Sequence, residues 1–297
     1  MKSSYNVEFN FEKYLNTVKN TTTIRYVGKV TSVNGLDIQS SGPRCVIGEI
    51  CTINVPSLKT KVLAEVVALE GTSVKLSAFG NTRGIEVGCE VVASGNTLQV
   101  PVGKSLLGRV IDATGAPCDG KGALVPETFY PAEKDSPDPM TRKPINRRIT
   151  TGVRAIDTLL TVGRGQRLGI FAGSGVGKST LLSMIARNTN ADVNVIALIG
   201  ERGREVLDFI NRDLGEEGLK RSVVIVATSD QPSICRLRAS YVATAVAEYF
   251  RDQGKDVMFM FDNVTRFAHA QREIGLAKGE PPAQKGYPPS VFDLIPK

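Results

Sequence analysis

The sequence predicts an α/β protein in which a small six-stranded β-barrel precedes a layered domain with a largely parallel sheet. Short β-rich runs with turn signals between them crowd residues 24–93. From residue 166 onward, strand-like and helix-like runs alternate, which is the pattern of a parallel sheet. A glycine-rich loop lies at the start of that alternation, and the 297 residues are enough for both parts.

The composition is that of a globular protein, with 41% hydrophobic and 23% charged residues. No apolar run approaches the roughly 20 residues that span a bilayer, and Glu8 and Glu12 make the N-terminus unlike a secretory signal. We therefore expect a cytosolic protein. Its five cysteines show no CxxC pairing, which favours reduced structural thiols over a metal site. The net charge of +7 permits contact with anionic lipid or nucleic acid and selects neither.

The first 22 residues contain an apolar series suited to a short helix. Counted from Phe11, the residues Tyr14, Leu15 and Val18 follow at +3, +4 and +7, so they share one helical face. Such a helix either binds a partner or packs on its own domain, and the sequence leaves both interpretations open.

The barrel region is predicted from six runs rich in β-branched residues. Asn34-Gly35, Glu70-Gly71 and similar turn pairs separate them. Closing six short strands into a barrel removes exposed sheet edges. The runs show no interleaving of basic and aromatic residues, so we expect no nucleic-acid platform. The predicted strands are 24–30, 33–38, 50–55, 62–69, 74–79 and 90–93.

A Gly/Pro-rich connection follows at 94–165, with brief β segments such as 106–112. Its basic cluster (Arg142, Lys143, Arg147 and Arg148) either faces a subunit or lipid or is a solvated linker. Beyond it, strands are expected near 166–172, 193–200, 223–229 and 257–262. Helices are expected near 178–190, 203–218, 233–253 and 264–278.

The loop after the first of these strands has the form of a phosphate-binding P-loop. Its glycines let backbone N–H groups turn inward around a phosphate, and the following helix adds the positive end of its dipole. Lys178 can reach the β- and γ-phosphates of a nucleotide, and the Ser179 hydroxyl can bind Mg²⁺. The sequence thus predicts an ATP site with Mg²⁺. The predicted cradle is Gly173, Ser174, Gly175, Val176, Gly177, Lys178, Ser179 and Thr180.

A nucleotide site of this kind needs a second acidic residue and a group that orients water. The apolar run 257–261 ends in Asp262, the Walker B form, which predicts a second Mg²⁺ group opposite Ser179. Glu201 follows the next predicted strand, at the same edge of the sheet, where it can accept a hydrogen bond from the attacking water. Arg202 is predicted to neutralise developing charge, and Glu205 to hold a metal-bound water. For Glu201 and Glu205, the alternative interpretation is that each is an acidic residue near the start of a helix, where it interacts favourably with the positive end of the helix dipole.

Two arginines follow the third strand of this domain. Arg236 either senses the γ-phosphate or serves a subunit interface or helix surface, and Arg238 lies beside it.

Together these stretches closely resemble the flagellar and type III protein-export ATPases, which are related to the catalytic subunits of rotary ATP synthases. The resemblance runs from about residue 100 to the end of the chain and is looser in the barrel. It rests on residues 151–157, 165–167, 171–179, 200–206, 264–268 and 286–292. The opening residue Ala172 is usual in that family. Asn263 stands where many export ATPases have Ser, although the rotary subunits often have Asn there.

The resemblance implies a RecA-like P-loop domain that hydrolyses ATP to energise protein export. It implies Lys178 and Ser179 as phosphate and Mg²⁺ groups, Glu201 as the catalytic carboxylate and Asp262 as the Walker B acid. It also implies a homo-hexamer at the cytoplasmic face of the cell membrane, with a peripheral membrane contact left open. The implied partners are a stalk-like regulatory protein at the N-terminal segment, the export gate, chaperones and export substrates.

The division expected from the resemblance is a partner-binding segment at 1–22, a barrel at 23–95 and an incomplete ATPase domain at 96–297. The family continues past Lys297, so the chain resembles a C-terminally truncated member, and we expect it to hydrolyse ATP poorly by itself. A rotary ATP synthase catalytic subunit and a non-catalytic nucleotide-binding fragment are the alternatives. The stretches 264–268 and 279–282 favour export over the rotary subunit.

Overall fold

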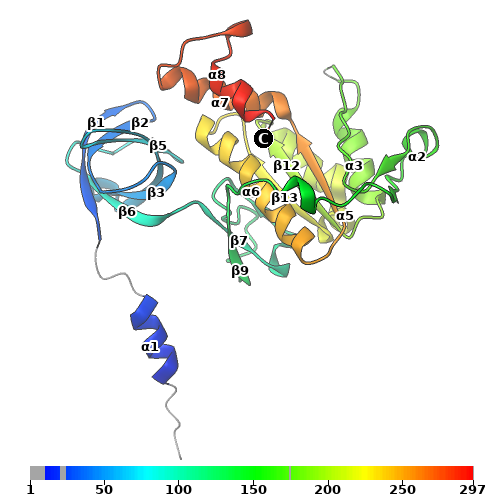
Figure 1. The fold of residues 1–297 in the computed structure, drawn as a ribbon, viewed down its shortest axis with the longest axis horizontal. Coiled ribbons are helices and arrows are strands. Elements are labelled where there is room, and N and C mark those ends of the chain that lie inside the picture. The colour runs from blue at the N-terminus through cyan, green and yellow to red at the C-terminus, as the bar shows by residue number, and fades with distance from the viewer. Residues whose placement is uncertain (1–10, 21–24, 174, 297) are drawn as a thin grey trace, which may run out of the picture.

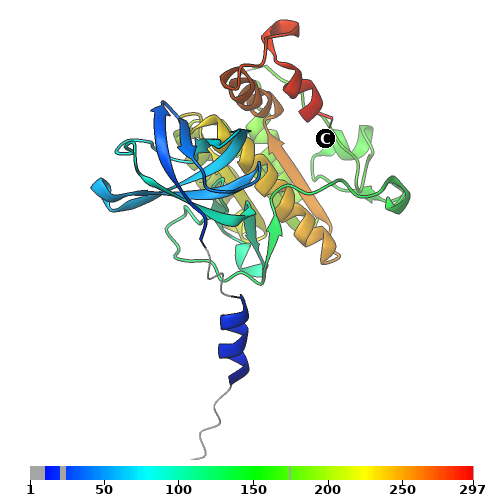
Figure 2. The ribbon, with the colours of Figure 1, turned by 60° about the vertical axis from the view of Figure 1, so that its left-hand side comes forward.

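The computed structural model describes residues 11–20, 25–173 and 175–296. Figure 1 shows a β-barrel beside an α/β domain, and Figure 2 shows the same pair turned. Among the described residues, no helix is both long and apolar enough to cross a membrane.

The barrel is closed, with the strand order β1-β2-β5-β4-β3-β6 and every pairing antiparallel. Alternate residues of its strands point inward, as Cys51, Ile53 and Val55 of β3 do, and they form a single buried core. The predicted strand 33–38 is wrong, because Asn34 ends one strand and Asp37 begins the next across a tight turn. The strands are β1 (Val27–Asn34), β2 (Asp37–Ser41), β3 (Glu49–Val55), β4 (Thr60–Glu70), β5 (Ser73–Ala78) and β6 (Glu90–Thr97).

The α/β domain contains a parallel sheet of order β14-β12-β13-β8. All seven residues of β12 are buried, as expected for a strand covered on both faces. Cys235 and other side chains of α6 pack with Val195 and Ala197 on one face, while Leu182 and Ile185 of α3 pack with Ile196 on the other. The strands are β8 (Val110–Ile111), β12 (Val193–Ile199), β13 (Ser222–Ala227) and β14 (Val257–Asp262).

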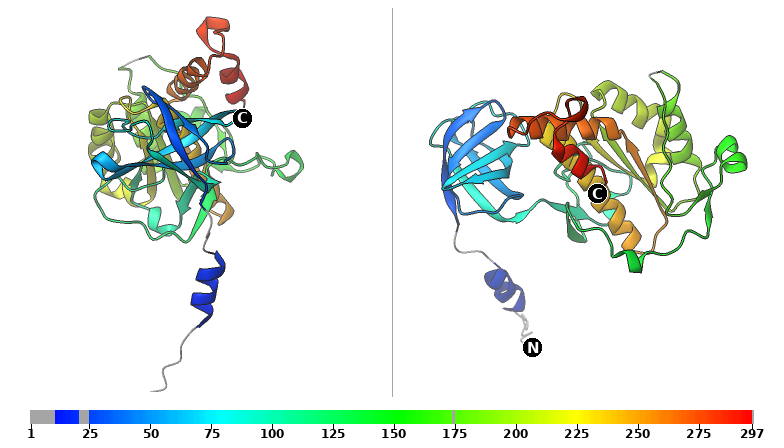
Figure 3. Two further views of the ribbon diagram at one scale, coloured as in Figure 1. Left: turned by 90° about the vertical axis from the view of Figure 1, so that its left-hand side faces the viewer. Right: turned by 45° about the horizontal axis from the view of Figure 1, so that its top comes forward.

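The helices of this domain flank the sheet in two layers, with α6 and α7 on one side and α3 on the other (Figure 3). The helix predicted over 203–218 is divided into α4, a π-helical turn and α5. The helices are α2 (Arg154–Leu159), α3 (Lys178–Asn188), α4 (Gly203–Asp208), the π-helix Phe209–Leu214, α5 (Gly215–Lys220), α6 (Ser233–Asp252), α7 (Val264–Ala277) and α8 (Pro289–Leu294).

Two small antiparallel pairs and four 3₁₀ turns also occur among the described residues, most of them in the connection between the barrel and the sheet. The pairs are β7 (Gln99–Val102) with β9 (Thr128–Pro131), and β10 (Arg148–Ile149) with β11 (Val162–Gly163). The turns outside the barrel are Lys104–Leu106, Pro139–Thr141 and Gln284–Gly286, and Pro56–Leu58 lies between β3 and β4.

The strand predicted near 166–172 is wrong: this segment forms no strand in the structure. A strand requires a neighbouring strand to pair its backbone groups. Here a cavity of about 1110 Å³ lies between the segment and β14, and the Phe171 side chain is 98% exposed. The P-loop therefore enters α3 from an extended segment that is not hydrogen-bonded into the sheet.

The predicted N-terminal helix is present as α1 (Phe11–Asn20). It extends away from the barrel in Figures 1 and 2, and Tyr14, Leu15 and Val18 are exposed. This arrangement argues against the interpretation in which its apolar face packs on its own barrel.

Candidate active site

The glycine-rich loop leads directly into α3, which begins at Lys178 as the sequence predicts. Gly175 has a φ of 78° and Gly177 a φ of 97°, both in the left-handed region that glycine adopts without strain. A Cβ placed on either residue would meet no atom within 4 Å, so these glycines are required by the backbone and not by packing. Ser174 of the predicted cradle lies outside the described residues.

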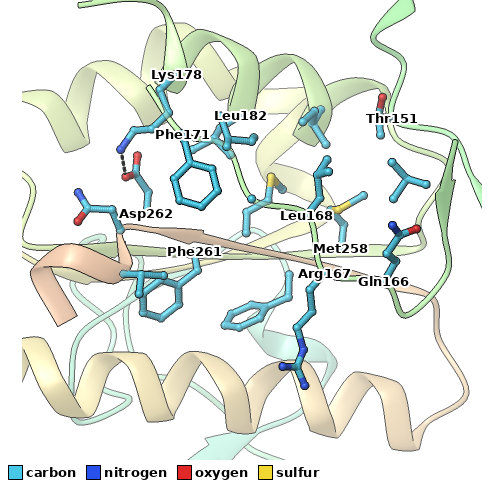
Figure 4. Close-up of a pocket in the computed structure, with 18 of the residues that line it drawn as sticks. Thr151, Gln166, Arg167, Leu168, Phe171, Lys178, Leu182, Met258, Phe261 and Asp262 are labelled. Atoms are coloured by element: carbon cyan, nitrogen blue, oxygen red, sulfur yellow. Dashed lines mark hydrogen bonds and ion pairs between the residues drawn. The ribbon is translucent and has the colours of Figure 1, made fainter. Parts of the chain in front are cut away.

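The start of α3 and the end of β14 meet at an ion pair. The Lys178 ammonium group donates a hydrogen bond to Oδ1 of Asp262, and the Asp262 side chain is only 5% exposed. Figure 4 shows this contact at one end of the larger cavity, with Thr151 and Gln166 toward the other end. A buried carboxylate needs a compensating charge, and Lys178 supplies it.

Glu201 follows β12 at the same edge of the sheet. Its Oε1 accepts a hydrogen bond from Nδ2 of Asn263, at 3.2 Å. Burial raises the pKa of Glu201, and so do a hydrogen bond with Glu205 and the nearby charge of Asp262, while Lys178 acts in the opposite direction. A carboxylate with a raised pKa is a better proton acceptor near neutral pH.

A second cavity of about 150 Å³ joins four of the predicted residues. Ser179, Glu201, Glu205 and Asp262 all line it, although they come from three separate segments of the chain. Hydroxyl and carboxylate oxygens are the ligands that Mg²⁺ prefers, so the chemistry of this lining suits the predicted metal.

Arg202 lies apart from these groups. Its side chain is 80% exposed, and its Nη1 donates to Oε1 of Glu205 at 3.0 Å. Glu205 forms hydrogen bonds with Glu201 and with Arg202, and both hydrogen bonds lower the pKa of Glu205. Arg202 therefore neutralises Glu205 at the start of α4.

The two arginines of α6 are also engaged with carboxylates. Arg236 donates to Glu273 of α7, and Arg238 pairs with Glu65 of the barrel. This placement fits the interpretation of Arg236 as a helix-surface residue, because its guanidinium is paired with Glu273 between α6 and α7.

Sequence reasoning assigned no role to three residues that shape this edge, namely Gly200, Asn263 and Arg266. Asn263 caps α7, with its Oδ1 accepting the backbone N–H of Arg266 at 2.8 Å. Gly200 has a φ of 74°, and the Arg266 side chain lies against it. An Asn directly before a helix is a recognisable cap signal, but its contact with Glu201 depends on the packing of two distant segments.

Comparisons with known proteins identify the relatives of this chain. The family model described as "ATP synthase alpha/beta family, nucleotide-binding domain" matches residues 152–297, and the beta-barrel domain of the same family matches residues 30–95. The "Flagellum-specific ATP synthase" of Treponema pallidum is 58% identical over 96% of this chain, and that of Bacillus subtilis is 55% identical over 96%. The "Type 3 secretion system ATPase" of Xanthomonas euvesicatoria is 51% identical over 92% of this chain.

A solved structure gives the same result for the fold. The assembled ATPase EscN of enteropathogenic Escherichia coli, in complex with its central stalk EscO, superposes with a TM-score of 0.85 at 45% identity and covers 91% of this chain and 66% of EscN. The chain spans 64% of the Treponema relative's length, 66% of the Bacillus relative's and 62% of the Xanthomonas relative's. By both family models, these identities and this fold, the chain belongs to the ATP synthase alpha/beta family, in the group of flagellum-specific and type 3 secretion ATPases.

Proposed function

We propose that the chain binds ATP with Mg²⁺ and hydrolyses it, as the ATPase of a flagellar or type III protein-export apparatus. One observation carries the proposal: Lys178, Asp262 and Glu201, from three separate segments, converge at the edge of the sheet where its strands end. Parallel sheets place ligands at this edge. The names of the relatives supply the export context.

In this proposal the phosphates displace Asp262 as the partner of Lys178. The loop of residues 173–180 surrounds them with backbone N–H groups, and the N-terminus of α3 adds partial positive charge. The Lys178 ammonium then faces the β- and γ-phosphates, and the Asp262 carboxylate becomes available as a metal ligand.

Ser179 and Asp262 would hold Mg²⁺, because both line the 150 Å³ cavity with oxygen ligands. Glu205 would reach the metal through a water molecule. When bound, the metal neutralises charge on the phosphate oxygens.

Glu201 would accept a hydrogen bond from the attacking water and orient it toward the γ-phosphate. Arg202 would stabilise charge on that phosphate after leaving Glu205. Breaking the Arg202–Glu205 ion pair costs little free energy, because a solvent-exposed ion pair contributes only about 0–1 kcal/mol.

The proposal extends to assembly and location. The EscN relative is described as an assembled ATPase with a central stalk, and we propose that copies of this protein likewise form a homo-hexamer bound to a stalk-like regulatory protein. The export gate, chaperones and export substrates are the further proposed partners, at the cytoplasmic face of the cell membrane. The proposed division is a docking segment at 1–22, a barrel at 23–95 and an ATPase domain at 96–297.

Two substitutions test the site. Lys178→Ala should abolish binding of a fluorescent ATP analogue with Mg²⁺, because it removes the charge that faces the phosphates. Glu201→Gln should bind the analogue like the parent chain. In a form extended to the full length of the relatives, it should lose roughly 10²–10⁴-fold in ATP turnover, the range expected for a general base. Lys220→Ala is the matched control, since Lys220 pairs with Glu217 on the surface of α5.

Unchanged affinity in Lys178→Ala would show that the loop is not the nucleotide site. Parental turnover in Glu201→Gln would assign the water-orienting role elsewhere. Binding without turnover in a parent extended to the full length of the relatives would overturn the hydrolysis proposal and favour a non-catalytic nucleotide-binding role.

A further inference from the structure

The cavity of about 150 Å³ at the candidate site extends beyond the metal and water groups to the π-helical turn Phe209–Leu214. Both ends of this turn are anchored in the core, because Phe209 is 5% and Leu214 is 1% exposed. π-Helical turns are rare, and they occur frequently at functional sites. Between its two anchors the turn carries Arg212, which forms part of the cavity wall.

Arg212 gives the cavity a positive charge that its other walls lack. Glu201, Glu205 and Asp262 line the same cavity, and among the described residues of its lining Arg212 is the one cation. The Asp262 side chain is 5% exposed and the Arg212 side chain 73%. The cavity therefore runs from buried carboxylates to an arginine at its solvent-exposed end. An anion that moves outward along it leaves the carboxylates and approaches the guanidinium, which is the favourable direction.

The guanidinium of Arg212 is held by a partner that it can exchange. Its Nε and Nη2 donate to Oδ1 and Oδ2 of Asp213, at 2.8 and 3.2 Å. An exposed ion pair of this kind contributes little to stability. The hydrogen bonds from Arg212 lower the pKa of Asp213, and the charge of Arg187 lowers it further. Asp213 therefore keeps a nearby positive charge when Arg212 turns to another anion. The two parallel donors of an arginine fit the oxygens of a phosphate as well as those of a carboxylate.

We propose that Arg212 binds the inorganic phosphate released by ATP hydrolysis, at the outer end of the 150 Å³ cavity, before the phosphate leaves the protein. Because this role rests on the proposed function, it takes the γ-phosphate to lie beside Glu201 and ADP to remain in the loop of residues 173–180. The space that adjoins the released phosphate is then the cavity, and the phosphate replaces Asp213 as the partner of Arg212.

Three substitutions separate this role from a structural one. Arg212→Gln removes the charge and the forked pair of donors. Arg212→Lys keeps the charge as a single ammonium group without the fork. Arg251→Gln is the matched control, because Arg251 also pairs with the aspartate that follows it, at 3.0 and 2.8 Å, on the surface of α6. The described residues that line the cavity do not include Arg251.

The first measurement needs no turnover. The chain is saturated with ADP and Mg²⁺, so that ADP occupies the loop, and binding of radiolabelled inorganic phosphate is measured by equilibrium dialysis. We expect Arg212→Gln to weaken phosphate binding roughly 10–100-fold, the range for lost hydrogen bonds to a charged group. Arg212→Lys should lose less, and Arg251→Gln should match the parent. ADP affinity should stay at the parental value in all three variants, because the loop holds ADP.

The second measurement is product inhibition of ATP hydrolysis, in a form extended to the full length of the relatives. The inhibition constant of phosphate should rise roughly 10–100-fold in Arg212→Gln, while KM for ATP stays close to the parent. A structural role would instead lower the thermal unfolding midpoint and weaken ADP and phosphate binding together.

Parental phosphate affinity in Arg212→Gln would overturn the assignment, and so would a parent chain whose ADP–Mg²⁺ complex binds no phosphate. Loss of ADP binding together with a lower thermal midpoint in Arg212→Gln would also overturn it and leave Arg212 as a structural residue. An extended parent that binds ADP and phosphate without hydrolysing ATP would overturn the proposed function instead, and the dialysis result would still decide whether Arg212 holds the phosphate.

Discussion

Arg238 of α6 and Glu65 of β4 form a buried ion pair that joins the α/β domain to the barrel. The guanidinium donates to both carboxylate oxygens, with 2.6 Å between Nε and Oε2, and the two side chains are 12% and 5% exposed. Its Nη1 also reaches Glu133 of the connecting segment at 2.9 Å. Burial disfavours the Arg238 charge, but the hydrogen bonds to Glu65 and Glu133 outweigh burial and raise its pKa.

Removing one partner of this pair should be costly. We expect Arg238→Met to destabilise the fold by about 3–5 kcal/mol, because it leaves the Glu65 carboxylate buried without a counter-charge. The combined change Glu65→Gln with Arg238→Met should recover part of that loss. Urea denaturation, followed by one spectroscopic signal from the barrel and one from the helices, measures the loss in the free energy of unfolding. Arg251→Met is the control on the same helix, since its exposed pairs contribute less than about 1 kcal/mol. An equal loss in Arg238→Met and Arg251→Met would contradict the prediction.

Asp119 should make stability depend on pH in the acidic range. Hydrogen bonds from Arg109, at 2.7 and 2.9 Å, hold the pKa of Asp119 well below its ordinary value of 3.8. A carboxyl group with a depressed folded-state pKa contributes stability above its unfolded pKa and loses it as the pH falls through the folded value.

We therefore expect Asp119→Asn to be less stable than the parent at pH 7, by about 3 kcal/mol, with the difference shrinking below about pH 4. Denaturant unfolding across pH 3–7 measures the difference. Asp37→Asn, at an exposed position of β2, is the control. A constant difference at all pH values would mean that lost packing, and not lost charge, explains the effect.

Gly200 should be needed for turnover more than for folding. A Cβ at this position would lie 2.9 Å from Cβ and Cγ of Arg266, and the φ of 74° is unfavourable for any L side chain. Gly200→Ala should push Arg266 aside and displace the adjacent Glu201. In a form extended to the full length of the relatives, ATP turnover should fall roughly 10–100-fold while ATP binding persists.

Gly254→Ala is the matched control for Gly200→Ala, because Gly254 has a φ of 77° and a Cβ there would meet nothing within 4 Å. It introduces the same backbone strain without the contact. If the two variants hydrolyse ATP at the same rate, the closeness of Gly200 to Arg266 is irrelevant to the site.

Deleting residues 1–20 should leave the rest of the protein equally stable. Tyr14, Leu15 and Val18 of α1 are exposed, so their removal costs the barrel little buried apolar area. Calorimetry should give an unchanged thermal midpoint, and docking to the proposed stalk-like partner should weaken. A lower midpoint would show that α1 packs on its own chain.

Local patterns were sufficient for much of the fold and for the convergence at the site. Alternating β-branched residues and turn pairs indicated the barrel strands, because side-chain direction alternates along every strand. The P-loop, Asp262 and Glu201 were placed together from sequence alone, since loops that follow parallel strands meet at one edge of the sheet. Those arguments need only the order of elements and the ends of strands.

Contacts between segments far apart in sequence were decided only by the tertiary structure. The apolar run near 168–171 has the pattern of a strand, yet it forms none, because pairing depends on a neighbour that local sequence does not reveal. Arg238 crosses to Glu65, and Asn263 reaches Glu201. The partner of a charged or amide side chain is chosen by how layers pack and how deeply the group is buried, and neither is encoded in the residues beside it.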